Sequence, residues 1–418
     1  MVRRSRRPNV PRKIVLFALG IALILGLHVK TAWAQDPGVT ATEIKIGNTA
    51  PYSGPASAYG TILKTVAAYF RKVNDEGGIN GRKINFISYD DSYSPPKTYE
   101  MTRKLVEQDH VLLDFAPLGT PPNTAIWKYM NQHQVPQLFV LTGASKWGDP
   151  KGHPWTMGWQ PTYYSEASVY AHYVLDHIPH AKIGILYQND DYGKDYLAGF
   201  EDGLAAQGRR LIVNRQSYEV TDPRIDSQIV NLKNSGANVF VNITTPKFAA
   251  MAIRKVHEIG WRPVQFLNNV SASVGAVLKP AGFEASKGVM TGIFGKDPSD
   301  PMWKDDPAMK RYYAFLQRYN PAADPKDAFN AVGYSVAQTL VYVLKRSGNN
   351  LSRANIMREA ANIRDLNLPL LMSGIMINTS PTDFYPIKQL QLAKFNGQRW
   401  EPFGTVYAGA INRQALVQ

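Results

Sequence analysis

The feature that most constrains the fold of this chain is a regular alternation of short β-rich segments with helix-patterned segments. In the first part of the chain, four apolar or β-branched runs are each followed by a segment with the apolar period of a helix; the runs are 43–50, 83–90, 111–116 and 136–141. The connections are short. Strands that alternate with helices in this way form a parallel sheet flanked by helices.

The same alternation starts again after residue 160. Strand-like runs recur at 182–188, 209–218, 238–244 and 264–269, again with helical segments between them. We therefore predict an α/β fold with two Rossmann-like units. A Pro/Asp-rich connection at 292–307 leads to a helical tail, and 386–407 reads as two strands with a turn at Asn396-Gly397. Ligands of open parallel sheets bind outside the carboxyl ends of the strands, so two facing units would share one cleft.

Residues 1–34 have the three parts of a secretory signal peptide. A basic head without acids precedes a short apolar stretch, and Ala32 to Ala34 form a small-x-small cleavage site before Gln35. The apolar stretch falls short of the roughly 20 residues that cross a bilayer as a helix. We expect cleavage and export by general secretion, and an uncleaved membrane anchor is the alternative.

Charge and cysteine content exclude several classes of function. The formal net charge is +14, but the leader holds seven of the cations and no acid, which leaves about +7 scattered over the mature chain. Because there is no Lys/Arg block and no stripe of basic and aromatic residues, we predict no nucleic-acid binding. The chain contains no cysteine, which excludes disulfides, thiol catalysis and zinc–thiolate sites.

Two turns after neighbouring strands have the composition of anion sites. Gly119 and Thr120 follow the 111–116 strand, and Gly143 and Ser145 follow the 136–141 strand. Backbone N–H groups at a helix start, together with a hydroxyl, favour a negative charge. Either turn alone could equally be an ordinary capped connection between a strand and a helix. Trp147, beside Ser145, could stack on a planar ligand or lie on a lobe surface.

Several motifs in order resemble the periplasmic type I solute-binding proteins of the leucine/isoleucine/valine-binding class. They are "EIKIGNTAPYSGPASAYG", "VNDEGGINGRKI" with "YDDSYSPPK", "ILYQNDDYGKDYLAGF" and the C-terminal "TDFYPIKQLQLAKFNG". The resemblance covers essentially the whole mature chain. It implies two lobes joined by a hinge with the ligand cleft between them: lobe one would comprise 35–159 plus 292–376, and lobe two 160–291 plus 377–418.

The resemblance also implies a function and a set of contact residues. Members of the family deliver a solute to the inner-membrane permease of an ABC importer and work in the periplasm without a cofactor; we expect a monomer. The two glycine-containing turns would bind the carboxylate of the solute. Tyr59 and Tyr192 would face the solute from opposite lobes, and the strand-end turns with Thr245 and Ser271 would complete the cleft.

The amino-acid binders of this class carry an acid after a lobe-two strand, and this chain departs from that pattern. No Asp or Glu occurs between Glu258 and Glu284. Since an unpaired buried ammonium is costly, we expect a ligand with a carboxylate and no ammonium, an aromatic or other hydrophobic acid. Branched-chain or other amino acids are the alternative, because Asp190 or Asp191 could serve the amine.

Other functions have less support. No histidine pair has the spacing of a zinc protease site, and Ser94 to Lys97 lacks the context of a serine hydrolase. The Asp90-Asp91 pair ends a strand. We therefore predict neither an enzyme nor a metal site. A ligand sensor acting through a separate membrane protein is a further alternative.

Overall fold

The computed structural model describes residues 36–409, and the predicted signal peptide lies outside the described residues. The first sheet has five strands in the order β2-β1-β3-β4-β5, and all four pairs of neighbouring strands in it are parallel. Its strands are β1 (Glu43–Ala50), β2 (Lys83–Asp90), β3 (Leu113–Phe115), β4 (Gln137–Val140) and β5 (Thr156–Gly158). The predicted parallel sheet is confirmed, and the short strand β5 was not predicted.

The second sheet has seven strands in the order β12-β11-β10-β9-β8-β6-β7. Strands β6 to β10 are parallel, whereas β11 and β12 form the predicted C-terminal hairpin and run antiparallel. The bounds are β6 (Ile183–Gln188), β7 (Ile212–Tyr218), β8 (Val239–Ile243), β9 (Val264–Leu267), β10 (Met290–Ile293), β11 (Gln389–Phe395) and β12 (Trp400–Ala408).

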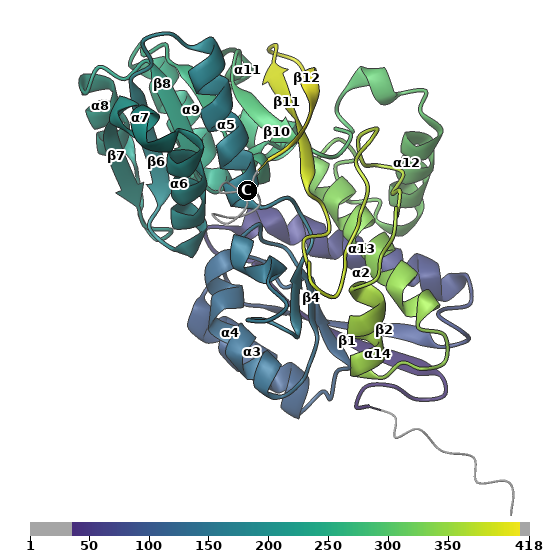
Figure 1. Ribbon diagram of the computed structural model, residues 1–418. Helices are drawn as coiled ribbons and strands as arrows, with labels where there is room; N and C mark the ends of the chain where they lie inside the picture. Colours follow the sequence, from purple (N-terminus) through teal and green to yellow (C-terminus); the bar gives the residue numbers. More distant parts are fainter. Residues whose placement is uncertain (1–35, 410–418) are drawn as a thin grey trace, which may run out of the picture. The chain divides into compact units, whose positions relative to one another are not determined.

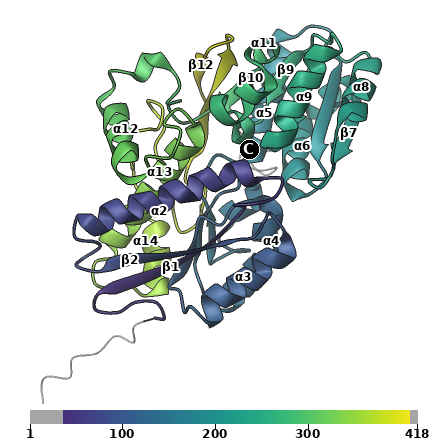
Figure 2. The same ribbon diagram turned by 180° about the vertical axis from the view of Figure 1, so that it is seen from behind.

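Helices flank both sheets (Figures 1 and 2). The longer ones are α2 (Gly60–Asp75), α3 (Pro95–Glu107), α4 (Thr120–Gln132), α5 (Tyr163–His177), α6 (Asp191–Gly203), α8 (Asp226–Asn234), α9 (Pro246–Glu258), α12 (Pro307–Tyr319), α13 (Ala328–Arg346) and α14 (Arg353–Ala360). Single turns form α7 (Ala205–Gly208), α10 (Lys279–Ala281) and α11 (Phe283–Ser286). No helix within residues 36–409 has both the length and the apolar character needed to cross a membrane.

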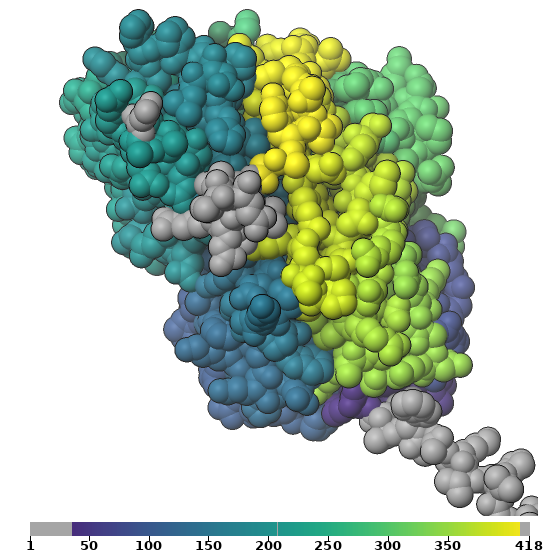
Figure 3. All heavy atoms as spheres, viewed as in Figure 1, coloured from purple at the N-terminus to yellow at the C-terminus, as the bar shows by residue number. Residues whose placement is uncertain are grey.

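The chain passes between the two sheets three times. After β10 it returns to the first sheet, where α13 packs closely on α2: a Cβ at Gly333 would lie 2.3 Å from the Ile62 carbonyl oxygen. It then reaches β11 in the second sheet, and Figure 3 shows this last part, in yellow-green and yellow, at the surface beside the blue and teal parts. Ile377, Phe384 and Ile387 still belong to the first core, and the exact lobe boundaries remain a prediction.

Candidate functional site

A cavity of about 120 Å³ lies at the carboxyl ends of the parallel strands. It takes residues from the ends of both sheets, as expected for facing α/β units. Apolar and aromatic side chains dominate its wall, with Tyr59, Tyr93, Leu118 and Leu141 contributed from the side of the first sheet, Tyr192, Thr245, Asn269 and Val270 from the side of the second, and Phe329 and Val332 from α13.

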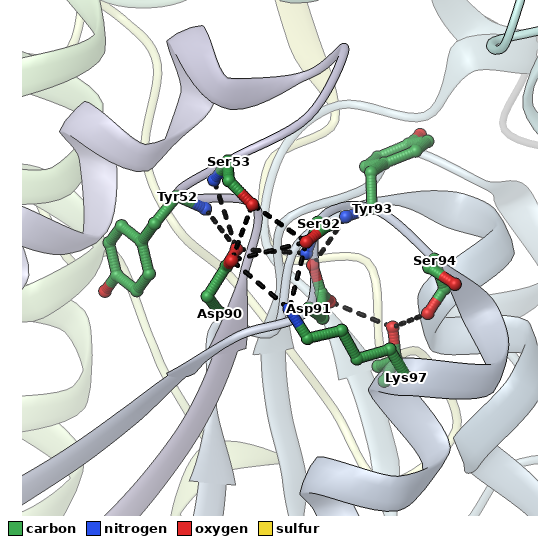
Figure 4. Close-up of polar contacts among 9 residues, drawn as sticks. Tyr52, Ser53, Asp90, Asp91, Ser92, Tyr93, Ser94 and Lys97 are labelled. Carbon is green, nitrogen blue, oxygen red and sulfur yellow. Dashed lines mark hydrogen bonds and ion pairs between the residues drawn. The ribbon is translucent and has the colours of Figure 1, made fainter.

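A hydrogen-bonded loop after β2 holds Tyr93 at the cavity (Figure 4). Ser92 and Tyr93 both have a left-handed backbone, with φ of 53° and 59°, which is uncommon for side-chain-bearing residues. The carboxylate of Asp90 accepts the N–H of Ser92 at 3.0 Å, and that of Asp91 accepts the N–H of Tyr93 at 2.8 Å. Asp91 also accepts the hydroxyl of Thr98 at 2.9 Å. The two aspartates therefore stabilise an unfavourable loop that places an aromatic ring in the wall.

Gly119 allows this ring to approach the main chain. Its φ is 100°, and a Cβ there would lie 2.3 Å from Cε2 of Tyr93. Across the cavity wall, Tyr59 packs on Phe329 with ring centroids 5.2 Å apart, and Tyr163 packs edge-on to Tyr192 at 5.1 Å. The site thus has a rigid aromatic wall, which suits a flat or branched apolar body.

The structure brings four of the nine predicted contact residues into the cavity wall: Tyr59, Gly119, Tyr192 and Thr245. The other five, Thr120, Gly143, Ser145, Trp147 and Ser271, are not among its lining residues. Whether any of the nine binds ligand stays a prediction.

The turn with Ser145 donates to a carboxylate of the chain itself. The N–H and the hydroxyl of Ser145 both donate to Asp195 of α6, at 3.0 and 2.5 Å. Next to it, Lys146 pairs with Asp191 at 2.7 Å. Burial raises the pKa of Asp195 to about 6, partly opposed by the hydrogen bonds from Ser145. The two Ser145 donors, which were expected to bind the carboxylate of a ligand, thus bind Asp195 instead. They connect the end of β4 in the first sheet to α6, which flanks the second sheet.

We expect Ser145→Ala to lower the free energy of unfolding by about 1–3 kcal/mol, because Asp195 loses one of its donors in a partly buried place. Urea denaturation at pH 7 measures this change, and Ser227→Ala on an exposed helix face is the control. A variant that keeps its stability but binds ligand less tightly would instead support the role predicted from the sequence.

The turn at Gly119 and Thr120 offers fewer amide donors than expected. Helix α4 begins at Thr120. Pro121 and Pro122 follow and have no N–H group, and the N–H of Asn123 donates to the carbonyl of Gly119 at 3.1 Å. The Thr120 hydroxyl is within 2.6 Å of that of Thr142. The N–H of Gly119 donates to the carbonyl of Leu141 at 3.2 Å, so among the residues that the structure describes the N–H of Thr120 is the one amide of this turn left as a donor for an anion.

The remaining predicted residues have internal contacts. Gly143 packs so closely on Tyr163 that a Cβ would lie 2.7 Å from the ring. Trp147 is buried, with Lys146 over its ring at 4.7 Å and His153 edge-on at 5.1 Å. Ser271 donates its hydroxyl to the carbonyl of Thr244 at 2.5 Å. These contacts place the three residues behind the wall.

Two charged wall residues, Lys296 and Asp297, were not predicted. Lys296 pairs with Asp306 at 2.6 Å, and Asp297 accepts the N–H of Ser299 at 2.7 Å. Burial raises the pKa of Asp297 to about 6, despite the hydrogen bonds from Ser299. The expected lack of an acid at the cavity was based only on the segment between Glu258 and Glu284. It therefore could not reveal Asp297, which the connection after β10 brings to the cavity.

A second buried acid supports the loop after β9. Glu166 of α5 accepts the hydroxyls of Tyr170 and Tyr196 and, at 2.6 Å, the N–H of Asn269. Burial raises its pKa to about 7, and these hydrogen bonds oppose the shift. Glu166 therefore holds the wall residue Asn269 in place. Within the described part of the chain, no cluster of three or more His, Cys, Asp or Glu residues could hold a metal ion.

Comparison with known proteins identifies one matching family and several similar chains. The family described as "Periplasmic binding protein" matches residues 43–399. A curated relative, "Leu/Ile/Val-binding protein homolog 1" of Brucella abortus (strain 2308), is 25% identical over 349 residues, which is 81% of this chain and 85% of the relative.

Two solved structures share the fold. One is a branched chain amino acid ABC transporter from Thermus thermophilus with bound valine, with a TM-score of 0.79 and 14% identity over 90% of this chain and 99% of that one. The other is a fatty acid ABC transporter substrate-binding protein from Thermomonospora curvata, with a TM-score of 0.75 and 21% identity over 90% and 95%. At these identities the likeness shows the fold alone.

Proposed function

The chain belongs to the periplasmic binding protein family, and from that premise we propose that it is the periplasmic solute receptor of an ABC importer. The observation that carries this proposal is the aromatic cavity at the carboxyl ends of the parallel strands of the two sheets. A secretory leader at 1–34 would bring the protein to the periplasm, where it acts as a monomer. The family consists of binding proteins, and a catalytic role is not proposed.

Hinged closure would couple binding to transport. A solute that contacts both lobes favours the closed form by the difference in its affinity for the two forms, and the permease would recognise that closed form. Contacts such as Ser145 with Asp195 and Lys146 with Asp191 link the strand ends of the first sheet to α6 and would form in the closed state.

The proposed ligand is a small carboxylate with an apolar body. The cavity volume of about 120 Å³ is slightly smaller than the roughly 150 Å³ of an engineered apolar cavity that binds benzene. A phenyl ring or a short branched alkyl chain would therefore fill the apolar part of the cavity. Valine and fatty acids, named for the two structural relatives, both combine a carboxylate with an apolar group.

Amino acids are the second candidate, and a specific observation favours them. Asp297 lines the cavity, and its cationic neighbour Lys296 is paired elsewhere, with Asp306. A carboxylate in this place could accept an ammonium group.

Matched ligand pairs test the proposal. We expect 3-phenylpropanoate and 3-methylbutanoate to raise the melting temperature and to bind at least about 10-fold more tightly than phenylalanine and valine, because an ammonium loses hydration in an apolar cavity. Thermal shift followed by calorimetry on the purified mature protein measures both effects. The reverse order would establish the amino-acid candidate, and no response to any of the four compounds would contradict the proposed ligand class.

A further inference from the structure

Glu166 lies behind the cavity wall and does not line the cavity itself. It belongs to α5 and is 2% exposed. Its carboxylate accepts three donors: the hydroxyl of Tyr170, the hydroxyl of Tyr196 at 2.5 Å and the main-chain N–H of Asn269 at 2.6 Å. Asn269 is a wall residue, and Tyr170 contacts the end of β10. Glu166 can therefore act on the cavity only through these neighbours.

The partners of Glu166 also hold the main chain at the end of β10. Strand β9 ends at Leu267, and beyond that end side chains take its place beside β10. The N–H of Gly292 donates to the hydroxyl of Tyr170 at 2.8 Å, and the carbonyl of Gly292 accepts the side-chain amide of Asn269. A Cβ at Gly292 would lie 3.5 Å from Cγ of Glu166. Both main-chain polar groups of Gly292 thus depend on residues that Glu166 binds.

Two segments of the cavity wall continue from these contacts. Asn269 and Val270 line the cavity after β9, and residues 293–295 line it after β10. The second segment is also the place where the chain returns from the second sheet to the core of the first, which it enters at Phe294. One buried carboxylate on α5 is therefore the common support of two wall segments that lie far apart in the sequence.

All three donors can be accepted only when Glu166 is ionised. A carboxylate accepts hydrogen bonds without donating, whereas the neutral acid carries a hydrogen that one of its neighbours must accept. The N–H of Asn269 cannot accept it, so a phenol has to turn. Tyr170 has one hydroxyl hydrogen and a second acceptor within reach, the carbonyl of Leu267 at 3.0 Å. Protonation of Glu166 therefore rearranges this set of hydrogen bonds and weakens the support of the wall.

The surroundings of Glu166 place this change near neutral pH. Burial raises the pKa of Glu166 to about 7, and the hydrogen bonds from the two phenols and the amide oppose the shift. The titratable groups that face the carboxylate are the phenols of Tyr163 and Tyr170 on α5 and of Tyr196 on α6. The loop after β9, β10 and β11 present groups that do not titrate: Asn269, Gly292 and Leu390.

We propose that Glu166 is a positioning residue of the binding site, whose carboxylate holds the wall segments after β9 and β10 without touching the ligand, so that the affinity of the cavity depends on its ionisation. This inference rests on the proposed function in taking the cavity as the ligand site. A ligand should bind more tightly when Glu166 is ionised, because wall segments that are less firmly held must be ordered on binding.

Glu166→Gln tests the proposal, with 3-phenylpropanoate as the probe. The amide has the shape of the neutral acid and does not ionise. We expect the variant to bind the probe about 5- to 10-fold more weakly than the parent at pH 8, and nearly as tightly as the parent at pH 6. The ratio of the two affinities removes the titration of Asp195 and Asp297, which both proteins share. Calorimetry at the two pH values measures this ratio.

Glu284→Gln, on an exposed turn outside the cavity, is the matched control and should bind the probe as the parent does at both pH values. Equal affinities of the parent and Glu166→Gln at pH 8 would overturn the proposal. A weaker affinity of Glu166→Gln by the same factor at pH 6 and pH 8 would overturn it as well, because a merely structural role does not follow the ionisation of the side chain.

Hydrogen exchange of the ligand-free protein provides a measurement that needs no ligand. At pH 8, peptides that contain the amides of Asn269 and Gly292 should exchange about 5-fold faster in Glu166→Gln than in the parent, while peptides from α13 exchange equally. Unchanged exchange at both amides would overturn the proposal. If the parent does not bind the probe, the proposed ligand class fails, and the exchange rates alone decide whether Glu166 holds the two wall segments.

Discussion

Replacing Asp114 with asparagine should raise the free energy of unfolding at pH 8 by about 2–4 kcal/mol and change it little at pH 4. Asp114 lies on β3 and is fully buried, and neither carboxylate oxygen has a hydrogen-bond partner among the described residues. Burial, followed by the charge of Asp91, raises its pKa to about 7. At pH 8 the folded protein must hold an unsolvated charge that asparagine lacks.

The sign follows from comparing the folded and unfolded chains. The unfolded chain releases this proton near its usual value of 3.8, whereas the folded protein keeps it until about pH 7. The protonated Asp114 therefore contributes its full share to the free energy of unfolding below about pH 4, and this contribution is lost as the pH rises through about 7. Asp91 is also buried with a pKa raised to about 6, so the two carboxyl groups titrate as a coupled pair.

Urea denaturation between pH 4 and pH 8 measures this effect. Asp176→Asn, on the exposed face of α5, is a matched control that should leave the pH profile of the parent unchanged. A loss of stability in Asp114→Asn at pH 8 would show that ordered water or an ion binds the two carboxylate oxygens.

Gly119→Ala should weaken binding of the ligand identified by the screen at least about 10-fold and should lower the free energy of unfolding by about 2–3 kcal/mol. The left-handed backbone, with φ of 100°, contributes part of the loss of stability. The rest comes from the new Cβ, which would lie 2.3 Å from the ring of Tyr93. Since Asp91 holds the backbone of Tyr93, the ring must turn, and the wall of the cavity changes.

Gly77→Ala separates the two causes. Gly77 has a φ of 104°, and a Cβ there would meet no atom within 4 Å. This variant should therefore show the loss of stability due to backbone strain without a change in affinity. Calorimetry and thermal denaturation of both variants measure the difference. Equal ligand affinity in the two variants would show that Tyr93 takes no part in binding.

Local patterns were sufficient for most of the fold and part of the site. The periods of apolar residues are short-range properties, so they predicted the parallel strands β1 to β4 and β6 to β9 and the hairpin of β11 and β12. The three-residue strand β5 and the four-residue strand β10 were missed. Strand ends also pointed to Tyr59, Gly119, Tyr192 and Thr245, which line the cavity.

The sequence by itself determined the α/β class, the two sheets and the edge of the sheets at which the cavity lies, because each depends on residues close together in the chain. Tertiary structure alone decided which polar groups remain for a ligand. Asp195 meets Ser145 across 50 positions of sequence, and the connection after β10 brings Asp297 to the cavity. Hydrogen-bond partners depend on how distant segments pack, and no local pattern records that.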